Sequence, residues 1–93
     1  MEIIKGLNDV STSEEQEIVL QVELNRPNQE VEWFKNGERI SPDLTQRFYS
    51  KDNLYFLKIN SCDTSLHAGE YTFKVKDLVE SKAAVYIKGL LSY

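Results

Sequence analysis

An alternation of apolar and mostly polar side chains runs through residues 17–24, and it restricts the chain to folds that contain extended strands. The apolar side chains occupy every second position: Ile18, Leu20, Val22 and Leu24. Because successive side chains of a β-strand point to opposite faces, this spacing gives the segment one apolar face and one largely polar face. The segment is therefore predicted to be a strand with one face in a core and the other in water.

The same period of two recurs along the chain and predicts four more strands, at residues 30–35, 54–59, 69–76 and 80–88. Turn-forming residues separate these segments. The clearest are Asn36 and Gly37, because both tolerate the positive φ of a tight hairpin. Since no helical period of useful length lies between them, the short strands predict an all-β fold, an antiparallel sandwich or a barrel.

Length and charge limit the classes of function. The 93 residues predict a single domain over residues 1–93. Eleven Lys and Arg against 15 Asp and Glu give a net charge of −4, which disfavours nucleic acid and anionic membranes as ligands. The expected partners are therefore other proteins, and the isolated domain is expected to be a monomer.

The cysteine content indicates a compartment. Cys62 is the single cysteine, so the chain cannot close an intramolecular disulfide. Small extracellular domains usually depend on such bonds, and the N-terminal residues lack the apolar block of a secretory signal. The expected location is cytoplasmic.

Cys62 and His67 are the one pair of side chains that resembles a nucleophile and a base. They stand five positions apart, which does not force them into contact. A third group to orient them is not evident, and two ligands fall short of a structural zinc site. We therefore expect no enzyme activity, no cofactor and no metal. His67 would act as a pH switch only if an interface depended on its charge.

Two motifs resemble the immunoglobulin fold of the I-set type. Trp33 lies in VEWFKNG, and Tyr71 lies in AGEYTF. In that family a Trp on strand C packs against the link between strands B and F, and a Tyr near the start of strand F forms the tyrosine corner. The resemblance places Val22 and Phe73 where the family usually has paired cysteines. It implies a two-sheet Greek-key sandwich that is held by packing instead of a disulfide.

Two longer segments, LNDVSTSEEQEIVLQV and FLKINSCDTSLHAGEYTF, resemble I-set domains of the giant intracellular muscle proteins, the group of titin, obscurin, myomesin and myosin-binding protein C. The resemblance implies a non-enzymatic mechanical spacer and docking module of the sarcomere, with sarcomeric or cytoskeletal proteins and neighbouring domains as partners. The alternative is the ectodomain of a cell-surface adhesion receptor that has lost its disulfide. The absence of glycan acceptor sites and the unpaired Cys62 disfavour that alternative.

Two positions depart from the family pattern. His67 stands where the family usually has an Asp that pairs with an Arg on strand D, here Arg47. Arg47 therefore needs another partner, such as Asp63, or stays solvated. Glu15 stands where the turn before strand B usually has Gly, so that turn must avoid a left-handed backbone or accept strain.

The alternation also divides the side chains between core and surface. The predicted core consists of Leu20, Val22, Trp33, Leu57, Ile59, Tyr71, Phe73 and Val85. If these side chains point inward, Phe34 and Tyr86 project outward as an aromatic contact patch flanked by Thr72 and Lys74. The alternative is an ordinary surface on which long neighbouring side chains cover the rings.

A second candidate contact is the strand from Lys82 to Lys88, which is predicted to be an open sheet edge. Such an edge accepts a strand of another protein by β-augmentation. Together the two candidates define the predicted partner-binding surface: Phe34, Thr72, Lys74, Tyr86, Lys82 and Lys88.

Overall fold

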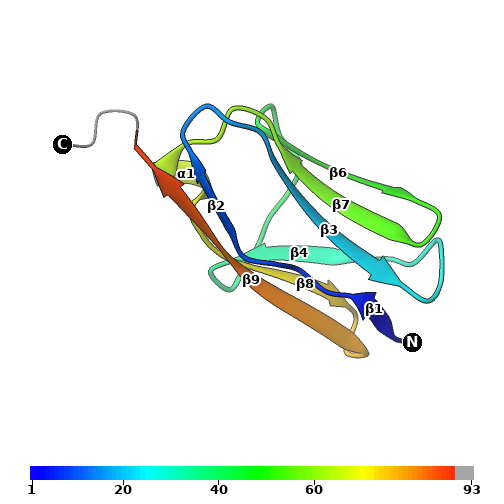
Figure 1. The fold of residues 1–93 in the computed structure, drawn as a ribbon. Coiled ribbons are helices and arrows are strands. Elements are labelled where there is room, and N and C mark those ends of the chain that lie inside the picture. Colours follow the sequence, from blue (N-terminus) through cyan, green and yellow to red (C-terminus); the bar gives the residue numbers. More distant parts are fainter. Residues whose placement is uncertain (90–93) are drawn as a thin grey trace.

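Two β-sheets packed face to face make up the fold (Figure 1). The computed structural model describes residues 1–89. Its elements are β1 (Ile3–Lys5), β2 (Val10–Ser13), β3 (Ile18–Leu24), β4 (Glu32–Lys35), β5 (Glu38–Arg39), β6 (Gln46–Lys51), β7 (Leu54–Ile59), α1 (Thr64–His67), β8 (Gly69–Val75) and β9 (Val79–Lys88). One sheet has the order β1-β3-β7-β6, and the other has the order β2-β9-β8-β4-β5. The predicted all-β sandwich is confirmed, and the cysteine is free.

The N-terminal segment contributes to both sheets. β1 pairs antiparallel with β3, and β2 pairs parallel with β9 over four residue pairs. Between β1 and β2 the chain crosses from one layer to the other, and there Leu7 N–H donates to Ser81 Oγ at 2.8 Å. A Cβ at Gly6 would lie 2.7 Å from the same Ser81 oxygen, so a larger residue there would force the hydroxyl to shift.

The core lies between the sheets and is built from alternate strand residues. All eight residues predicted to form it are at most 2% exposed. Phe73 stands opposite Trp33 in the register of β8 and β4, and their ring centroids are 5.1 Å apart in an edge-to-face arrangement. Val22, at the other position where the resemblance placed a cysteine, belongs to the same core cluster. Apolar packing therefore occupies the place of the disulfide.

Tyr71 anchors the connection that leads into β8. Its hydroxyl donates a 2.6 Å hydrogen bond to the backbone oxygen of His67, so the polar end of this buried ring is satisfied. Burial raises the pKa of Tyr71 to about 12. Asp63 precedes α1, and its carboxylate caps the helix by accepting Ser65 N–H at 2.8 Å. No helix within residues 1–89 has the length and apolar character to cross a membrane.

The turn between β2 and β3 uses a left-handed backbone conformation. Glu15 has a φ of 69°. Two hydrogen bonds to a neighbouring loop hold the turn, since Glu15 N–H donates to Cys62 O at 2.9 Å and Cys62 N–H donates to Gln16 O at 3.0 Å. A side chain in this conformation costs about 1 kcal/mol. Of the two outcomes left open by the sequence, the turn accepts strain.

Candidate functional site

Cys62 and His67, the candidate nucleophile and base, are each engaged with other groups. Both are buried, with 2% and 3% of their surfaces exposed. Cys62 Sγ lies 3.2 Å from the backbone oxygen of Ser13, whereas His67 Nδ1 accepts Asp63 N–H at 2.9 Å. Their hydrogen bonds go to different partners, and neither is arranged to act on the other.

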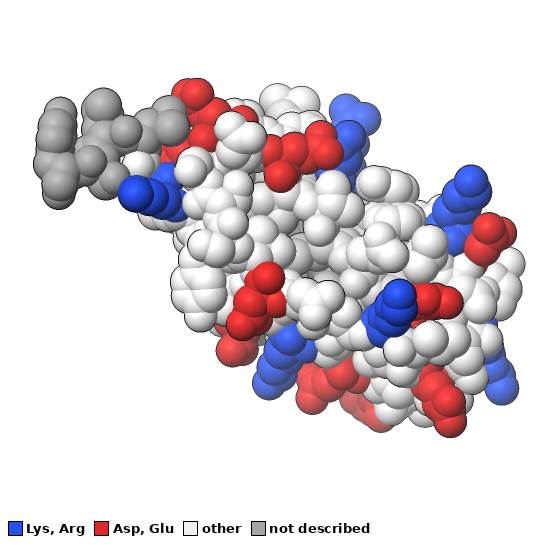
Figure 2. All heavy atoms as spheres, in the orientation of Figure 1, with Lys and Arg blue, Asp and Glu red and all other residues white. Residues whose placement is uncertain are grey.

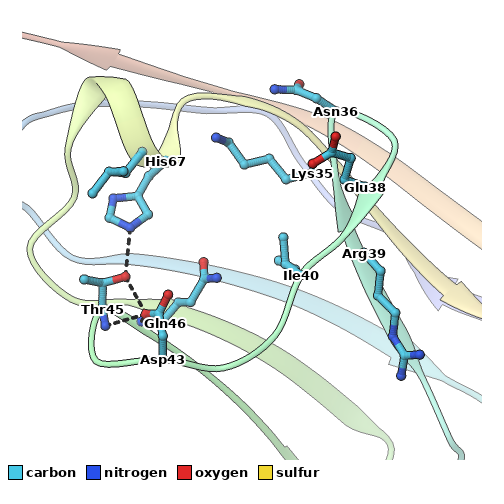
Figure 3. A pocket seen from close by; sticks show the side chains of 10 residues that line it. Lys35, Asn36, Glu38, Arg39, Ile40, Asp43, Thr45, Gln46 and His67 are labelled. Carbon is cyan, nitrogen blue, oxygen red and sulfur yellow. Dashed lines mark hydrogen bonds between the residues drawn. The ribbon is translucent and has the colours of Figure 1, made fainter.

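A chain of hydrogen bonds runs from His67 to the loop before β6 (Figure 3). His67 Nε2 lies 3.1 Å from Thr45 Oγ1, and Thr45 Oγ1 donates to Asp43 Oδ1 at 2.7 Å. Because Nδ1 already accepts a hydrogen bond from Asp63 N–H, the ring proton resides on Nε2, which donates to Thr45. The neutral imidazole thus ties α1 to this loop.

The surroundings of His67 keep it neutral. Burial lowers the pKa of His67, and the positive charge of Lys35 lowers it further, while Asp43 and Asp63 act in the opposite direction. Hydrogen bonds from Thr45 in turn lower the pKa of the Asp43 carboxyl. Both ring nitrogens are occupied, so His67 is a structural link and not a free base.

This link stands where the resemblance to I-set domains implies an ion pair. Asp63, the candidate partner of Arg47, instead caps α1 by accepting Ser65 N–H. Arg47 is exposed. The ion pairs that residues 1–89 form are Arg39–Glu32 at 3.6 Å and Lys58–Glu17 at 3.4 Å. Arg47 is therefore solvated.

A hollow of about 480 Å³ lies beside His67, between the β4–β5 hairpin, the loop before β6 and α1 (Figure 3). Its charged lining mixes both signs, with Lys35 and Arg39 against Glu38 and Asp43. In the part of the chain that the structure describes, no group of three or more His, Cys, Asp and Glu side chains could hold a metal ion. The hollow presents no set of groups directed at one class of ligand.

The predicted aromatic patch is not one surface. Phe34 is half-buried beside Lys74, whose Nζ lies 6.0 Å from the ring centroid, whereas Tyr86 is 60% exposed. The backbone positions of the two residues are separated by two strand spacings and four residues, which is about 16 Å by strand geometry. The prediction that Thr72 flanks an exposed patch is wrong: Thr72 is only 9% exposed, because its short side chain lies between Phe34 and Lys82.

The strand from Lys82 to Lys88 is not an open edge, which corrects the second prediction. β2 pairs with the end of β9, and Ala84 N–H donates to Asp9 Oδ1 at 2.8 Å. Lys82 and Lys88 are exposed on the outer face. Figure 2 shows acidic side chains gathered beside the turn between β2 and β3, and side chains of both signs along β9. The N-terminal segment therefore closes the part of β9 from Ala84 to Lys88 to β-augmentation.

A sequence model of the immunoglobulin I-set domain family matches residues 1–86. The chain belongs to this family. The I-set domain is 45% identical over 40 residues, or 43% of the chain, to muscle M-line assembly protein unc-89 of Caenorhabditis elegans. It is 33% identical over 76 residues, or 81% of the chain, to titin of Drosophila melanogaster. The matched residues make up only a very small part of each relative's own length, 0% to the nearest per cent.

The fold of this I-set domain has close counterparts among solved structures. The I9–I11 tandem from titin superposes with a TM-score of 0.88 at 28% identity, over 95% of this chain and 33% of that chain. The resemblance to I-set domains of muscle proteins is thus confirmed.

The sequence did not predict one exposed edge of the I-set domain, the strand β6, in which the aromatic pair Phe48 and Tyr49 is the main feature. β6 is the outermost strand of the four-stranded sheet and pairs with β7 alone. Tyr49 is 48% exposed and stacks on Phe56 with 4.7 Å between ring centroids. A groove of about 320 Å³, with Trp33 and Phe48 among its lining residues, opens beside the strand. This edge joins the outer face of β9 as a candidate contact surface.

Proposed function

We propose that this I-set domain is a mechanical spacer and docking module of a large modular muscle protein in the cytoplasmic sarcomere. The single observation that carries the mechanical role is the parallel pairing of β2, an N-terminal strand, with β9, the last strand among residues 1–89. The similarity to unc-89 and titin supports the muscle setting. The proposed partners are neighbouring domains and other proteins, and neither nucleic acid nor membrane.

Tension applied through the two ends of the chain would load the β2–β9 pair in shear. β1 lies at one end of the sandwich, whereas β9 ends at the opposite end (Figure 1). β2 and β9 run in the same direction, and Glu14 N–H extends their ladder with a 3.0 Å bond to Lys88 O. Sliding the strands apart lengthwise breaks these bonds together. A domain of this kind would resist force in series with similar domains.

The docking role is supported by side chains on the outer face of β9. Tyr86 is 60% exposed, and Lys82 and Lys88 are exposed on the same strand. Aromatic residues are frequent at the energetic centres of protein interfaces. Capture of sarcomeric proteins by the wild-type domain, compared with Tyr86→Ala and with Lys82→Glu plus Lys88→Glu, tests this face. Partners retained by both variants would exclude it.

Single-molecule stretching tests the mechanical role. The wild-type domain and two variants are each placed in a chain with marker domains of known unfolding force. Every second residue of β2 directs its N–H at β9, and Glu14 belongs to this series. Thr12, two residues earlier, belongs to it too, so Thr12→Pro removes an N–H from the ladder. Ser50→Pro removes an N–H from the edge strand β6 and is the matched control. The unfolding force of Thr12→Pro is expected to fall well below both others, and equal forces for all three would contradict the mechanical role.

A further inference from the structure

β6 has one paired side and one open side. Lys51 and Leu54 close a two-residue turn, so they exchange backbone hydrogen bonds. In an antiparallel pair the bonded residues recur at every second position. Arg47, Tyr49 and Lys51 therefore direct their backbone N–H and C=O groups at β7, and the residues between them direct theirs away from the sheet.

Two residues on the open side of β6 have backbone groups without a hydrogen-bond partner among residues 1–89. Gln46, at the start of the strand, is satisfied by the preceding loop: its N–H donates to Asp43 Oδ1 at 3.1 Å, and its C=O accepts Asp43 N–H at 2.9 Å. Within residues 1–89 no such bond reaches Phe48 or Ser50. Their N–H and C=O groups form a free edge that can pair with another strand.

The groove beside this edge offers space for the side chains of an added strand. It has a volume of about 320 Å³. Its lining combines the apolar residues Val31, Trp33, Ile40, Pro42 and Phe48 with the polar residues Glu32, Arg39 and Ser41. Phe48 forms the wall nearest the edge, with its ring centroid 6.3 Å from that of Trp33. Because side chains alternate between the faces of a strand, every second side chain of an added strand would point toward this groove.

The opposite face of the edge is basic. Arg47 and Lys51 are both exposed and stand on either side of Tyr49 along β6. Lys58 lies beside Arg47 on β7 and is paired with Glu17, but the ion pairs within residues 1–89 include neither Arg47 nor Lys51. The remaining side chains of an added strand would face these cations, so carboxylates are favoured there.

A second copy of the chain suits this edge less well than an acidic partner does. Two β6 strands in antiparallel pairing would bring Arg47 and Lys51 of one copy close to the same residues of the other. Like charges on neighbouring strands destabilise a sheet, and basic side chains on edge strands commonly prevent such self-pairing. The charge pattern therefore selects against a homodimer through β6.

We propose that the free edge of β6 binds an extended segment of a partner protein in which acidic residues alternate with apolar ones. Phe48 and Ser50 supply the main-chain hydrogen bonds, apolar side chains enter the groove, and carboxylates contact Arg47 and Lys51. The proposal rests on the docking part of the proposed function. It uses a different sheet from the one that carries Tyr86, so peptide binding here can fail while the mechanical role and the Tyr86 face stand.

The probe is a labelled six-residue peptide of alternating Glu and Val, matched in length to β6. Fluorescence anisotropy and NMR titration of the isotopically labelled domain follow its binding. We expect saturable binding in which the backbone amides of Phe48 and Ser50 shift most and become protected from hydrogen exchange. A peptide with Lys in place of Glu, and one with the three Glu before the three Val, control for charge and for alternation and are expected not to bind.

Two pairs of variants separate backbone pairing from charge. Ser50→Pro removes a donor from the free edge, and Ser50→Ala retains it as the matched control. Arg47→Glu with Lys51→Glu reverses the charge of the edge, while Lys82→Glu with Lys88→Glu makes the same change in net charge on the other sheet. We expect the first variant of each pair to weaken binding about tenfold or more, and each control about twofold or less. Thermal unfolding checks that every variant is folded.

Several results would overturn the proposal. These are absence of binding by the Glu-Val peptide, amide shifts centred away from Phe48 and Ser50, and binding that survives both the proline and the charge-reversal variants. Dimerisation through β6 in sedimentation experiments without peptide would also overturn it, because a second copy would then be the occupant. If Ser50→Pro fails to fold, the amide shifts of the wild type and the charge-reversal pair decide the outcome.

Discussion

Phe73 and Trp33 lie opposite each other in the register of β8 and β4, with ring planes inclined by 70°. Phe73 also approaches Tyr55 on the other sheet, with 5.8 Å between ring centroids. The phenyl ring therefore contacts aromatic groups of both layers and is fully buried. Its packing links the two sheets, as a covalent disulfide does in many domains of this shape.

Replacing Phe73 by Ala is expected to lower the free energy of unfolding by about 3–5 kcal/mol, because the change removes apolar contacts and leaves a cavity. Urea unfolding measures the loss. Tyr86→Ala, at a position that is 60% exposed, is the control and should cost about 0.5 kcal/mol or less. A loss below about 1 kcal/mol for Phe73→Ala would mean that the ring does not hold the sheets together.

The domain is expected to lose stability as the pH falls below about 6.5, the ordinary pKa of histidine. The pKa of His67 is lowered in the folded state, chiefly by burial. Between the folded and the ordinary pKa the unfolded chain binds more protons, so acid favours unfolding. This contribution is fully present above about pH 6.5 and is lost toward the folded-state pKa, with a slope of at most about 1.4 kcal/mol per pH unit.

The variant His67→Gln isolates this effect from the titration of carboxylates. Urea unfolding of both proteins between about pH 7.5 and 5 gives the two pH profiles, and their difference belongs to His67. The variant should be less stable at neutral pH, because the 3.1 Å contact with Thr45 is altered, yet it should lose less stability in acid. Parallel profiles would contradict the prediction.

Removing the Tyr71 hydroxyl should destabilise the domain by about 1–3 kcal/mol, because the buried backbone oxygen of His67 loses its 2.6 Å hydrogen bond. Tyr71→Phe keeps the ring and its packing. Tyr49→Phe makes the same chemical change at a position that is 48% exposed and should be nearly neutral. Equal midpoints of thermal unfolding for the two variants would refute a role for this hydrogen bond.

Glycine at position 15 is expected to stabilise the domain by about 0.5–1 kcal/mol. Glu15 has a φ of 69°, a conformation that glycine adopts without steric cost. Gln16→Gly, one residue later, relieves no left-handed conformation and should be destabilising. Thermal unfolding of the two variants compares them, and a lower melting temperature for Glu15→Gly would show that the side chain at this position is worth more than the strain it causes.

The sequence predicted the strands whose burial imposes a period of two. The five predicted segments overlap β3, β4, β7, β8 and β9, each of which alternates buried side chains with less buried ones over at least part of its length. The segment predicted at 69–76 ends at Val75 in the structure, because Lys76 turns the chain with a φ of 50°. β6 has a single buried residue, Gln46, so its sequence lacks the apolar alternation that burial imposes on the other strands.

The contact surfaces were harder to predict than the strands. Alternation sets the face toward which a side chain points but not the neighbours that cover it, and for this reason Thr72 was expected to be exposed. The cover of β9 joins residues as far apart as Asp9 and Ala84, 75 positions along the chain. His67 likewise finds Thr45 at a separation of 22 positions. Pairings over such distances leave no local pattern in a single sequence.

The position of β2 along β9 links two properties of the domain. β2 covers β9 on the side away from β8, and under the proposed mechanical role it is also the strand that tension shears from β9. Once β2 is displaced, the last residues of β9 lose their ladder partner and become an uncovered edge, which other chains can pair with. We therefore expect that a domain from which tension has removed β2 associates with other chains through β9. The four residues of β2 would then protect the domain both from unfolding under force and from aggregation.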